Sequence, residues 1–311
     1  VTFREFFKQA DLSQVSGWDP VVKTMRSSDA TSNFSGKTGA GFLQRFSDGS
    51  AIPTLNRYKL YDTSVSHDPV GGRIEVTRQT KLFRDFDNVF NESSDLINAV
   101  KVYLSRAGAQ IFNRAFTDGS GVTAGTRVVQ YGDAAPTVST SHPRADGGTA
   151  QSNASSTSIP LTESNTETGR IALFNQLADD GVPMVAPGEL YLVVGINLDK
   201  TAQIITGSNL RASTANNDIN IYSGGMMKVM SSSWLDSGIS GASVGSNTQW
   251  FLVAPNWAKL RIVIANGPDV ELLQDKDTKS FLFDVVLDLG VCSYDWRGVW
   301  GSQGDNSAYT G

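Results

Sequence analysis

An apolar stripe in the middle of the chain constrains its fold more than any other sequence feature. Six residues recur at spacings of four, four, three, four and four, as on one face of an α-helix: Leu96, Val100, Leu104, Ala107, Ile111 and Ala115. Residues 93–95 offer N-caps, and Asp118 with Gly119 provides a stop. About 23 helical residues at ~1.5 Å each predict a rod of about 35 Å. Gly108, within the stripe, predicts a close crossing by another segment.

The rest of the composition favours β-structure joined by long connections. Apolar residues make up 40% of the 311 residues, charged residues make up 18%, and Gly, Ser, Thr and Asn are frequent. This balance excludes wholesale disorder. No apolar run is long enough to span a membrane. The start of the chain lacks the pattern of a signal peptide. It also lacks an initiator Met, which leaves open whether maturation removed a segment.

Residues 1–85 carry apolar groups without a helical stripe that could bury them. Residues 1–49 alternate short aromatic patches with Ser, Gly and Asp, so this segment is expected to lie across something else. Residues 55–66 and 73–83 alternate as strands do, and the HDPVGG run between them has turn chemistry. The sequence therefore predicts a β-hairpin that reverses at residues 68–72, with Ile74 and Val76 on one face. A lone hairpin is marginal in water and needs a neighbour.

Mixed α/β structure is expected after the long helix. Residues 117–161 are a long Gly/Ser/Thr-rich loop, which usually indicates function or wrapping over a partner. A second helix is predicted from Thr162 to Asp180, ended by Gly181 and Pro183. Its apolar face consists of Ile171, Phe174 and Leu177. Strands are then expected at ELYLVVG, MMKVM, TQWFLVA and KLRIVIANG and within the final apolar stretch SFLFDVVLDLGVCSYDWRGVWG, with a short helix at NLDKTAQIITG.

The catalytic signatures in the chain fail when their context is tested. Residues 241–245 match G-x-S-x-G, but no histidine follows and a strand comes next. Residues 36–38 resemble the end of a P-loop without its first glycine, and residues 119–124 match a dinucleotide fingerprint that follows a helix. Two distant histidines and one cysteine make a zinc site improbable. We therefore predict no catalytic, cofactor-binding or metal-ligating residues, no cofactor, and no enzyme activity.

The remaining candidate side chains have structural interpretations. His67, beside Asp68, is interpreted as a solvated turn residue, and His142 as a donor of hydrogen bonds that pin the long loop. Cys292 lies in an apolar run and is expected to be a buried small hydrophobe. Trp296 and Trp300 are expected to be core or interface anchors. The net charge of −5 argues against a dedicated nucleic-acid reader, but not against a container for DNA.

Several segments resemble a known family. The run FNRAFTDGSG, followed by YGDAAPTVSTSHPRADGG and SNASSTSIPLTESN, is similar to the central region of tailed-phage major head subunits, with the Mu-type branch nearest. NDINIYSGGMMKVMSSSWL, TQWFLVAP and DWRGVWGSQGDNSAY resemble later segments of the same family. The resemblance covers residues 86–311, whereas residues 1–85 match only by layout.

The resemblance implies an α+β fold of the Hong Kong 97 capsid type, with an N-terminal arm, an extended β-hairpin loop, a long spine helix, and peripheral and axial domains. The implied division is as follows: 1–49 N-terminal arm; 50–88 extended β-hairpin loop; 89–186 peripheral domain with the spine helix and the long loop; 187–264 axial domain; 265–311 terminal strands returning to the peripheral domain. No crosslinking residues of the family can be matched in this chain.

The implied function is that of a major capsid protein, which self-assembles into an icosahedral shell enclosing phage double-stranded DNA. Implied partners are further copies in hexamers and pentamers, packaged DNA through weak non-specific contact, and portal, scaffold or decoration proteins, with no membrane. The implied location is the virion, after assembly in the host cytoplasm. Two alternatives stay open: a shell subunit of an encapsulin-like nanocompartment that encloses cargo protein, and a secreted Ser/Thr-rich enzyme or adhesin.

Overall fold

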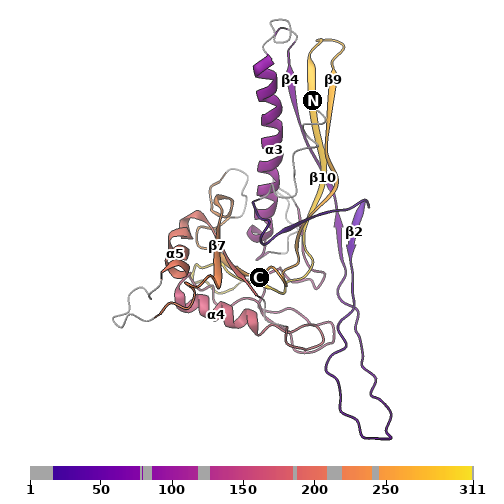
Figure 1. The fold of residues 1–311 in the computed structure, drawn as a ribbon, viewed down its shortest axis with the longest axis vertical. Helices are drawn as coiled ribbons and strands as arrows, with labels where there is room; N and C mark the ends of the chain where they lie inside the picture. Colours follow the sequence, from indigo (N-terminus) through magenta and orange to yellow (C-terminus); the bar gives the residue numbers. More distant parts are fainter. Residues whose placement is uncertain are drawn as a thin grey trace.

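The computed structural model describes residues 17–77, 79, 86–117, 127–184, 188–208, 219–239 and 245–309. Figure 1 shows three parts along the molecule. A long helix and a long β-ribbon run side by side toward one end, a small sheet with two helices lies to one side, and an extended loop projects toward the opposite end. The mixture of sheets and helices makes the chain an α+β protein, as the sequence predicts.

The long helix α3 (Phe86–Asn113) carries the predicted stripe on its buried face. All six stripe residues are at most 4% exposed, including Ala115 in the turn after the helix. The helix nevertheless begins before residues 93–95, which were predicted as its N-caps and lie inside it. Asp95 is exposed there. Residues of capping type are tolerated on a solvated helix face because intrinsic propensity is a weak preference. The helix ends at Asn113, before the predicted stop at residues 118–119, which themselves lie outside the described residues.

The predicted close crossing at Gly108 is confirmed. A Cβ placed on Gly108 would lie 2.4 Å from Cδ1 of Trp18, so only hydrogen leaves room for the indole ring. Trp18 is 1% exposed, donates its Nε1–H to the Ser105 carbonyl at 2.7 Å, and stacks on Phe112. The first described segment of the arm is therefore anchored on the helix of its own chain.

A large sheet packs against α3. Its order is β1 (Lys23–Arg26), β9 (Leu260–Gln274), β10 (Phe281–Ser293) and β4 (Asp68–Val76), and the short β5 (Val128–Val129) also pairs with β10. Strands β4 and β9 flank β10 in antiparallel register, forming the ribbon of Figure 1. Every second side chain along each strand faces α3 and belongs to the apolar core between helix and sheet. Ile74, Val76 and Val285 are examples.

The predicted hairpin reversal at residues 68–72 is wrong. Asp68–Val76 is one continuous strand, and all nine of its residues pair with β10. Pro69 and two glycines are tolerated because β4 is an edge strand, where a missing donor costs little. The hairpin that the structure describes joins β2 (Thr31–Phe34) to β3 (Thr63–Ser66), so it begins before residue 50 and shares only residues 50–66 with the predicted range 50–88. The prediction that Ile74 and Val76 share a face is confirmed.

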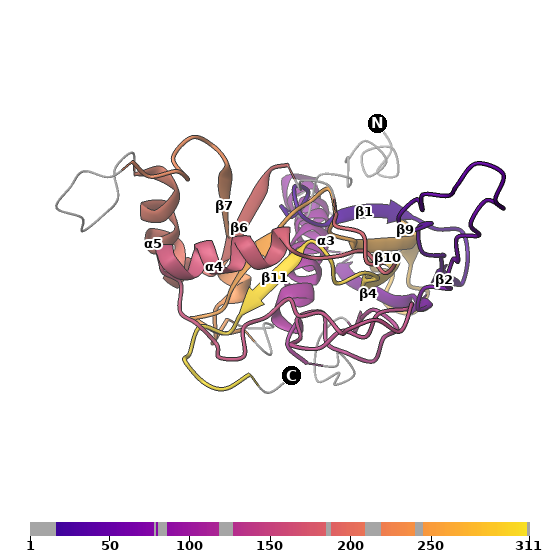
Figure 2. The same ribbon diagram turned by 90° about the horizontal axis from the view of Figure 1, so that it is seen from below.

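A smaller sheet forms the second core. Its order is β11 (Val299–Ser302), β8 (Trp250–Val253), β6 (Leu190–Val194) and β7 (Met227–Ser231), and the predicted strands at these positions are confirmed. Helices α4 (Glu163–Phe174) and α5 (Ile196–Gly207) pack on it, and a 3-10 turn η2 (Ser233–Leu235) follows β7. Figure 2 shows α4 lying across this sheet, beside β11 and β6.

Helix α4 is shorter than predicted. Thr162 caps it by accepting from the Asn165 N–H at 3.2 Å, as expected, but the helix ends at Phe174 instead of Asp180. Gln176 then makes two bonds to the C-terminal segment, to the Gly298 N–H and the Val299 carbonyl, and these tertiary contacts replace further helix. The predicted apolar face is also wrong at Ile171, which is 49% exposed.

Candidate assembly surfaces

The most unusual surface belongs to residues 35–62, here called the extended loop, which joins β2 to β3. Near its base the Thr38 N–H donates to the Tyr58 carbonyl at 2.8 Å, and the Leu60 N–H donates to the Gly36 carbonyl at 3.0 Å. The Gly41 N–H reaches Asp180 Oδ2 at 3.3 Å. Beyond this base, within a stretch that the structure describes throughout, no backbone hydrogen bond joins the two arms. The distal loop thus has little internal support.

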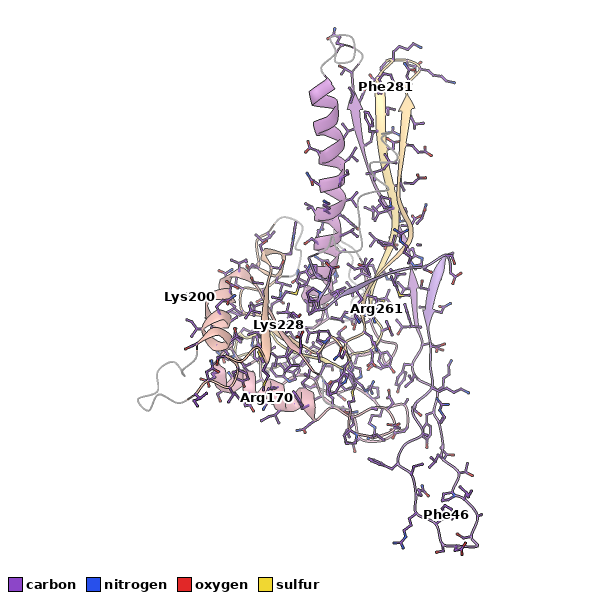
Figure 3. The ribbon with its side chains drawn as sticks, viewed as in Figure 1. Phe46, Arg170, Lys200, Lys228, Arg261 and Phe281 are labelled. Atoms are coloured by element: carbon purple, nitrogen blue, oxygen red, sulfur yellow. The ribbon has the colours of Figure 1, made fainter. Side chains whose placement is uncertain are left out.

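The distal loop nevertheless presents large apolar side chains to solvent. Figure 3 shows Phe46 near its tip, far from either core. The side chains concerned are Phe42 (64% exposed), Leu43 (89%), Phe46 (50%) and Ile52 (77%). Clusters of exposed apolar groups on a protein mark interaction sites. The loop is therefore a candidate contact surface. Residues 36–38, which resemble the end of a P-loop, lie near its base.

A second candidate surface lies on the small-sheet side. Ile171 of α4 and two isoleucines between α5 and β7, Ile219 (76% exposed) and Ile221 (54%), line a shallow pocket together with Glu163 and Tyr222. Glu167, at the same pocket, accepts two hydrogen bonds from Arg170, which hold the pKa of its carboxyl below the usual range. The pocket is thus apolar with charged residues at its margin.

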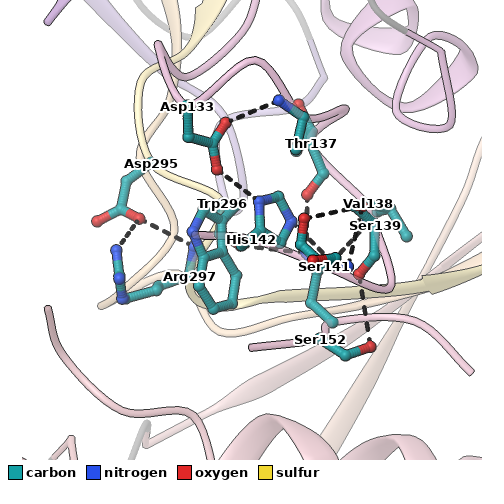
Figure 4. A network of polar contacts seen from close by, with 12 residues as sticks. Asp133, Thr137, Val138, Ser139, Ser141, His142, Ser152, Asp295, Trp296 and Arg297 are labelled. Atoms are coloured by element: carbon teal, nitrogen blue, oxygen red, sulfur yellow. Dashed lines mark hydrogen bonds and ion pairs between the residues drawn. The ribbon is translucent and has the colours of Figure 1, made fainter. Parts of the chain in front are cut away.

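His142 pins the long loop, as the sequence predicts. The imidazole is fully buried, and its Nδ1 lies 2.7 Å from Asp133 Oδ2 (Figure 4). Its Nε2 lies 3.2 Å from Asn153 Oδ1. Its ring stacks on Trp296, with centroids 4.2 Å apart. The contacts tie the loop to the C-terminal segment, so the role of His142 is structural.

Asn153 is the centre of the same polar cluster. Its Oδ1 also accepts from the Ser139 N–H at 2.7 Å, while its Nδ2 donates to the carbonyls of Thr137 at 2.7 Å and Val299 at 3.1 Å. Both ends of the amide are therefore used, and they join two turns of the long loop to β11.

A buried ion-pair group continues the cluster on the other face of Trp296. The Arg297 guanidinium lies over this indole, 4.6 Å from the ring centroid. It pairs with Asp179 and with Asp295, each at 3.0 Å, and donates Nε–H to the Leu177 carbonyl. The segment after α4, the long loop and the C-terminal segment are consequently held as one unit.

His67 does not have the predicted role. It is half-buried between β3 and β4, where Nε2 lies 3.2 Å from Ser32 Oγ and Nδ1 lies 3.0 Å from the Ala30 carbonyl oxygen. The interpretation as a solvated turn residue is wrong because the chain does not turn at Asp68. His67 instead fastens β3 to the segment before β2.

Cys292 is fully buried in β10, as predicted. Burial raises the pKa of its thiol to about 12, so almost no reactive thiolate exists at pH 8. We expect iodoacetamide at pH 8 to leave the native protein unmodified and to label Cys292 rapidly once urea unfolds it, as intact-mass spectrometry would show. Stoichiometric labelling of the folded chain would contradict this burial.

Within the described ranges no group of three or more His, Cys, Asp and Glu side chains is placed to hold a metal ion. Among the helices that the structure describes, none is both long enough and apolar enough to cross a bilayer. The nucleophile-elbow and dinucleotide look-alikes at residues 241–245 and 119–124 lie wholly or largely outside the described residues.

These surfaces define a class: a subunit with a projecting loop whose large apolar side chains are not covered by the described part of its own chain. The sequence model of the phage capsid protein family matches residues 61–302, which is most of the chain. The chain belongs to the phage capsid protein family. It is a structural capsid protein of the tailed-phage major capsid type, which confirms the resemblance to that class; the Mu-type branch stays a prediction.

Solved structures agree on the fold. The chain is similar to the capsid protein of a native GTA particle (TM-score 0.53, 12% identity, 94% of this chain and 91% of that one). It is also similar to the capsid protein of cyanophage P-SCSP1u (TM-score 0.52, 11% identity, 90% and 85%) and to that of Myoviridae phage XM1 (0.51, 10%, 94% and 91%). The predicted fold class is therefore confirmed. A search of curated proteins found no match.

Proposed function

We propose that this capsid protein assembles into an icosahedral shell of pentamers and hexamers that encloses double-stranded DNA in a virion. The extended loop carries the proposal, because it exposes four large apolar side chains on a segment with little support of its own. Cover from neighbouring copies removes these groups from water at about 25 cal/mol per Å². Weak contacts repeated in a closed symmetric shell then give a stable container.

The division into domains follows the two cores. We propose that β6, α5, β7 and β8, within residues 187–264, form the axial domain, which meets its copies around the symmetry centres. The peripheral domain comprises α3 and the ribbon. Strand β11 departs from the simplest division, because it comes from residues 299–302 and yet pairs with β8 of the small sheet. The net charge of −5 suits a wall that contacts DNA only weakly, and we propose no catalytic role. Assembly in the host cytoplasm, and contacts with portal, scaffold or decoration proteins, belong to the same proposal.

Electron microscopy of the expressed full-length chain tests the proposal. We expect closed icosahedral particles, and particles isolated from infected cells should show the ultraviolet absorbance of nucleic acid. Native particles with protein absorbance alone, filled with cargo enzyme, would instead support a nanocompartment. A chain that stays monomeric under every assembly condition would overturn the shell function.

The loop makes a specific prediction. Leu43→Asp places a charge where 89% of the side chain is exposed, so the free energy of unfolding of the unassembled subunit should change by less than about 0.5 kcal/mol. Assembly should be lost, because the carboxylate would be desolvated beneath a neighbour. Size-exclusion chromatography and urea unfolding measure the two effects. Gln44→Asp, at the next exposed position, adds the same charge without removing an apolar group. If Leu43→Asp assembles like the parent, the apolar tip is not a contact.

A further inference from the structure

The hydrogen bonds around His142 determine which atoms of its ring carry protons. The imidazole has no exposed surface, so water cannot supply a missing donor or acceptor. Its Nδ1 lies against Asp133 Oδ2, as Figure 4 shows, and its Nε2 lies against Asn153 Oδ1. A neutral imidazole has a proton on one nitrogen and a lone pair on the other. A neutral ring therefore fits only if one of these two oxygens can donate a hydrogen bond.

The Asn153 oxygen cannot donate, because three other bonds fix the orientation of its amide. Nδ2 donates to the carbonyl oxygens of Thr137 at 2.7 Å and Val299 at 3.1 Å. Oδ1 accepts from the Ser139 N–H at 2.7 Å. A reversed amide would set its oxygen against two carbonyl oxygens and its NH2 group against an N–H. Nε2 of His142 therefore carries a proton, which it donates to Asn153 Oδ1.

The other ring nitrogen faces a carboxyl group. The Asp133 side chain has no exposed surface, and its Oδ1 accepts from the Ala135 N–H at 3.1 Å. Two bare acceptors would repel each other at the 2.7 Å between Nδ1 and Oδ2, so a proton lies between them. Imidazole binds that proton more tightly than carboxylate does, since their ordinary pKa values are about 6.5 and 3.9. Parallel stacking on Trp296, with 6° between the ring planes, also favours a cationic ring.

The charge of such a ring is balanced inside the protein. Asp133 is buried whichever form His142 takes, so the imidazolium supplies a counter-charge to a buried carboxylate. The other charged and titratable groups packed around this cluster are Tyr131 and the ion pairs of Arg144 with Asp146 and of Arg297 with Asp179 and Asp295. Burial raises the pKa of Tyr131, so its phenol is neutral at pH 8. Among the described residues, only Asp133 and Asn153 form hydrogen bonds with the ring nitrogens.

We propose that His142 is an imidazolium in the folded protein at pH 8, and that its second proton locks the long loop to the C-terminal segment. An ordinary histidine favours the neutral ring about 30-fold at this pH. A neutral His142 would lose the partner of one nitrogen and leave the Asp133 carboxylate buried without a counter-charge. Each loss is worth a factor of about 5–150, so together they outweigh that preference. This proton-dependent lock goes beyond the proposed shell function and does not depend on it.

Nuclear magnetic resonance of the unassembled full-length chain, labelled with isotopic nitrogen in its histidines, tests the protonation directly. At pH 8 we expect two one-bond proton–nitrogen cross-peaks from the His142 ring, one for each nitrogen. His67 is the matched control, because the Ser32 hydroxyl beside its Nε2 can rotate to donate or accept, so no contact requires a second proton. The variant His67→Gln assigns the signals. A single N–H on the His142 ring at pH 8 would overturn the proposal.

The pH dependence of folding provides a second measurement. The unfolded chain releases the His142 proton near pH 6.5 and the folded chain keeps it, so the stability that this proton contributes is complete below pH 6.5 and falls above it. Between pH 6 and pH 8 the folding equilibrium constant should fall about 25-fold through this site.

Comparison with His142→Gln isolates this fall, because burial raises the pKa of Asp295 in both chains and that contribution is shared. His67→Gln should keep the fall of the parent. If the parent and His142→Gln change in parallel from pH 6 to pH 8, the fold does not hold the proton. If His142→Gln does not fold, the ring spectra of the parent chain decide between the two protonation states.

Discussion

Replacing Gly108 with Val should lower the free energy of unfolding of the subunit by about 3–5 kcal/mol, as measured by urea denaturation followed through tryptophan fluorescence. The new Cβ would lie 2.4 Å from Trp18 Cδ1 and 2.7 Å from its Cγ, so either the indole or the helix must move. Overpacking of a close-packed site costs about 1–3 kcal/mol. Displacing the indole adds the loss of its burial, its hydrogen bond to Ser105 and its stacking on Phe112.

A matched control and a double mutant separate the clash from the cost of a β-branched residue in a helix. Gly207, at the end of α5, has open space around its Cβ direction, so Gly207→Val should cost no more than about 1 kcal/mol. In Trp18→Ala/Gly108→Val the clash partner is absent. The double mutant should therefore be no more than about 1 kcal/mol less stable than Trp18→Ala alone. Strict additivity of the two substitutions would show that the ring does not fill the space above Gly108.

The contact between Trp18 and Gly108 shows which part of the fold could be predicted from the sequence. The spacing of the α3 stripe reports helical period directly, and a glycine within a buried stripe indicates close approach. Both inferences were confirmed because they depend on local geometry. The sequence could not predict which segment crosses the helix at Gly108, because Trp18 lies 90 residues earlier and no periodicity links the two residues. Strands such as β6 and β8 could be predicted because each is a short apolar run, which is likewise a local pattern.

Pairing between strands is where the sequence interpretation failed. Asp68, Pro69 and two glycines are strong turn residues, and they would turn if only neighbours in sequence mattered. Nine residues of pairing with β10 outweigh that preference, and β10 lies more than 200 residues further along the chain. The early end of α4 has a similar cause, since Gln176 bonds to residues 298 and 299. Long-range partners leave no local signal.

The sequence indicated one of the exposed surfaces, the extended loop, but not the acidic face of the ribbon. Residues 1–85 were expected to supply contacts, and the extended loop does lie there, although it begins before residue 50 and ends at residue 62. The acidic face of the ribbon opposite α3 escaped prediction, because Glu75, Asp284 and Glu271 come together only through the pairing of β4, β10 and β9. Alternation of charged and apolar residues in DVVLD and DVELL is the signal that could have indicated a strand with a charged face.

Asn153→Leu should lower the free energy of unfolding by about 4 kcal/mol, although leucine has the same branched arrangement of side-chain heavy atoms as asparagine. The change leaves the Ser139 N–H, the Thr137 carbonyl and His142 Nε2 without the partner that asparagine provides, all around a side chain with no exposure. Each buried polar group that loses its partner costs about 1–3 kcal/mol. Urea denaturation measures the total change in the free energy of unfolding. Loss of hydrogen-exchange protection at the Ser139 amide would locate the effect in the long loop.

The control is Asn197→Leu on α5, where the amide is exposed and bonds only to Asn247, so its expected cost is below about 1 kcal/mol. A larger expected effect at Asn153 follows from burial, because water cannot replace the lost partners there as it does at Asn197. The same reasoning predicts that assembled particles of the Asn153 variant melt at a lower temperature, since every subunit carries the defect. A variant within about 1 kcal/mol of the parent, with the Ser139 amide still protected, would mean that Asn153 does not hold the long loop to β11.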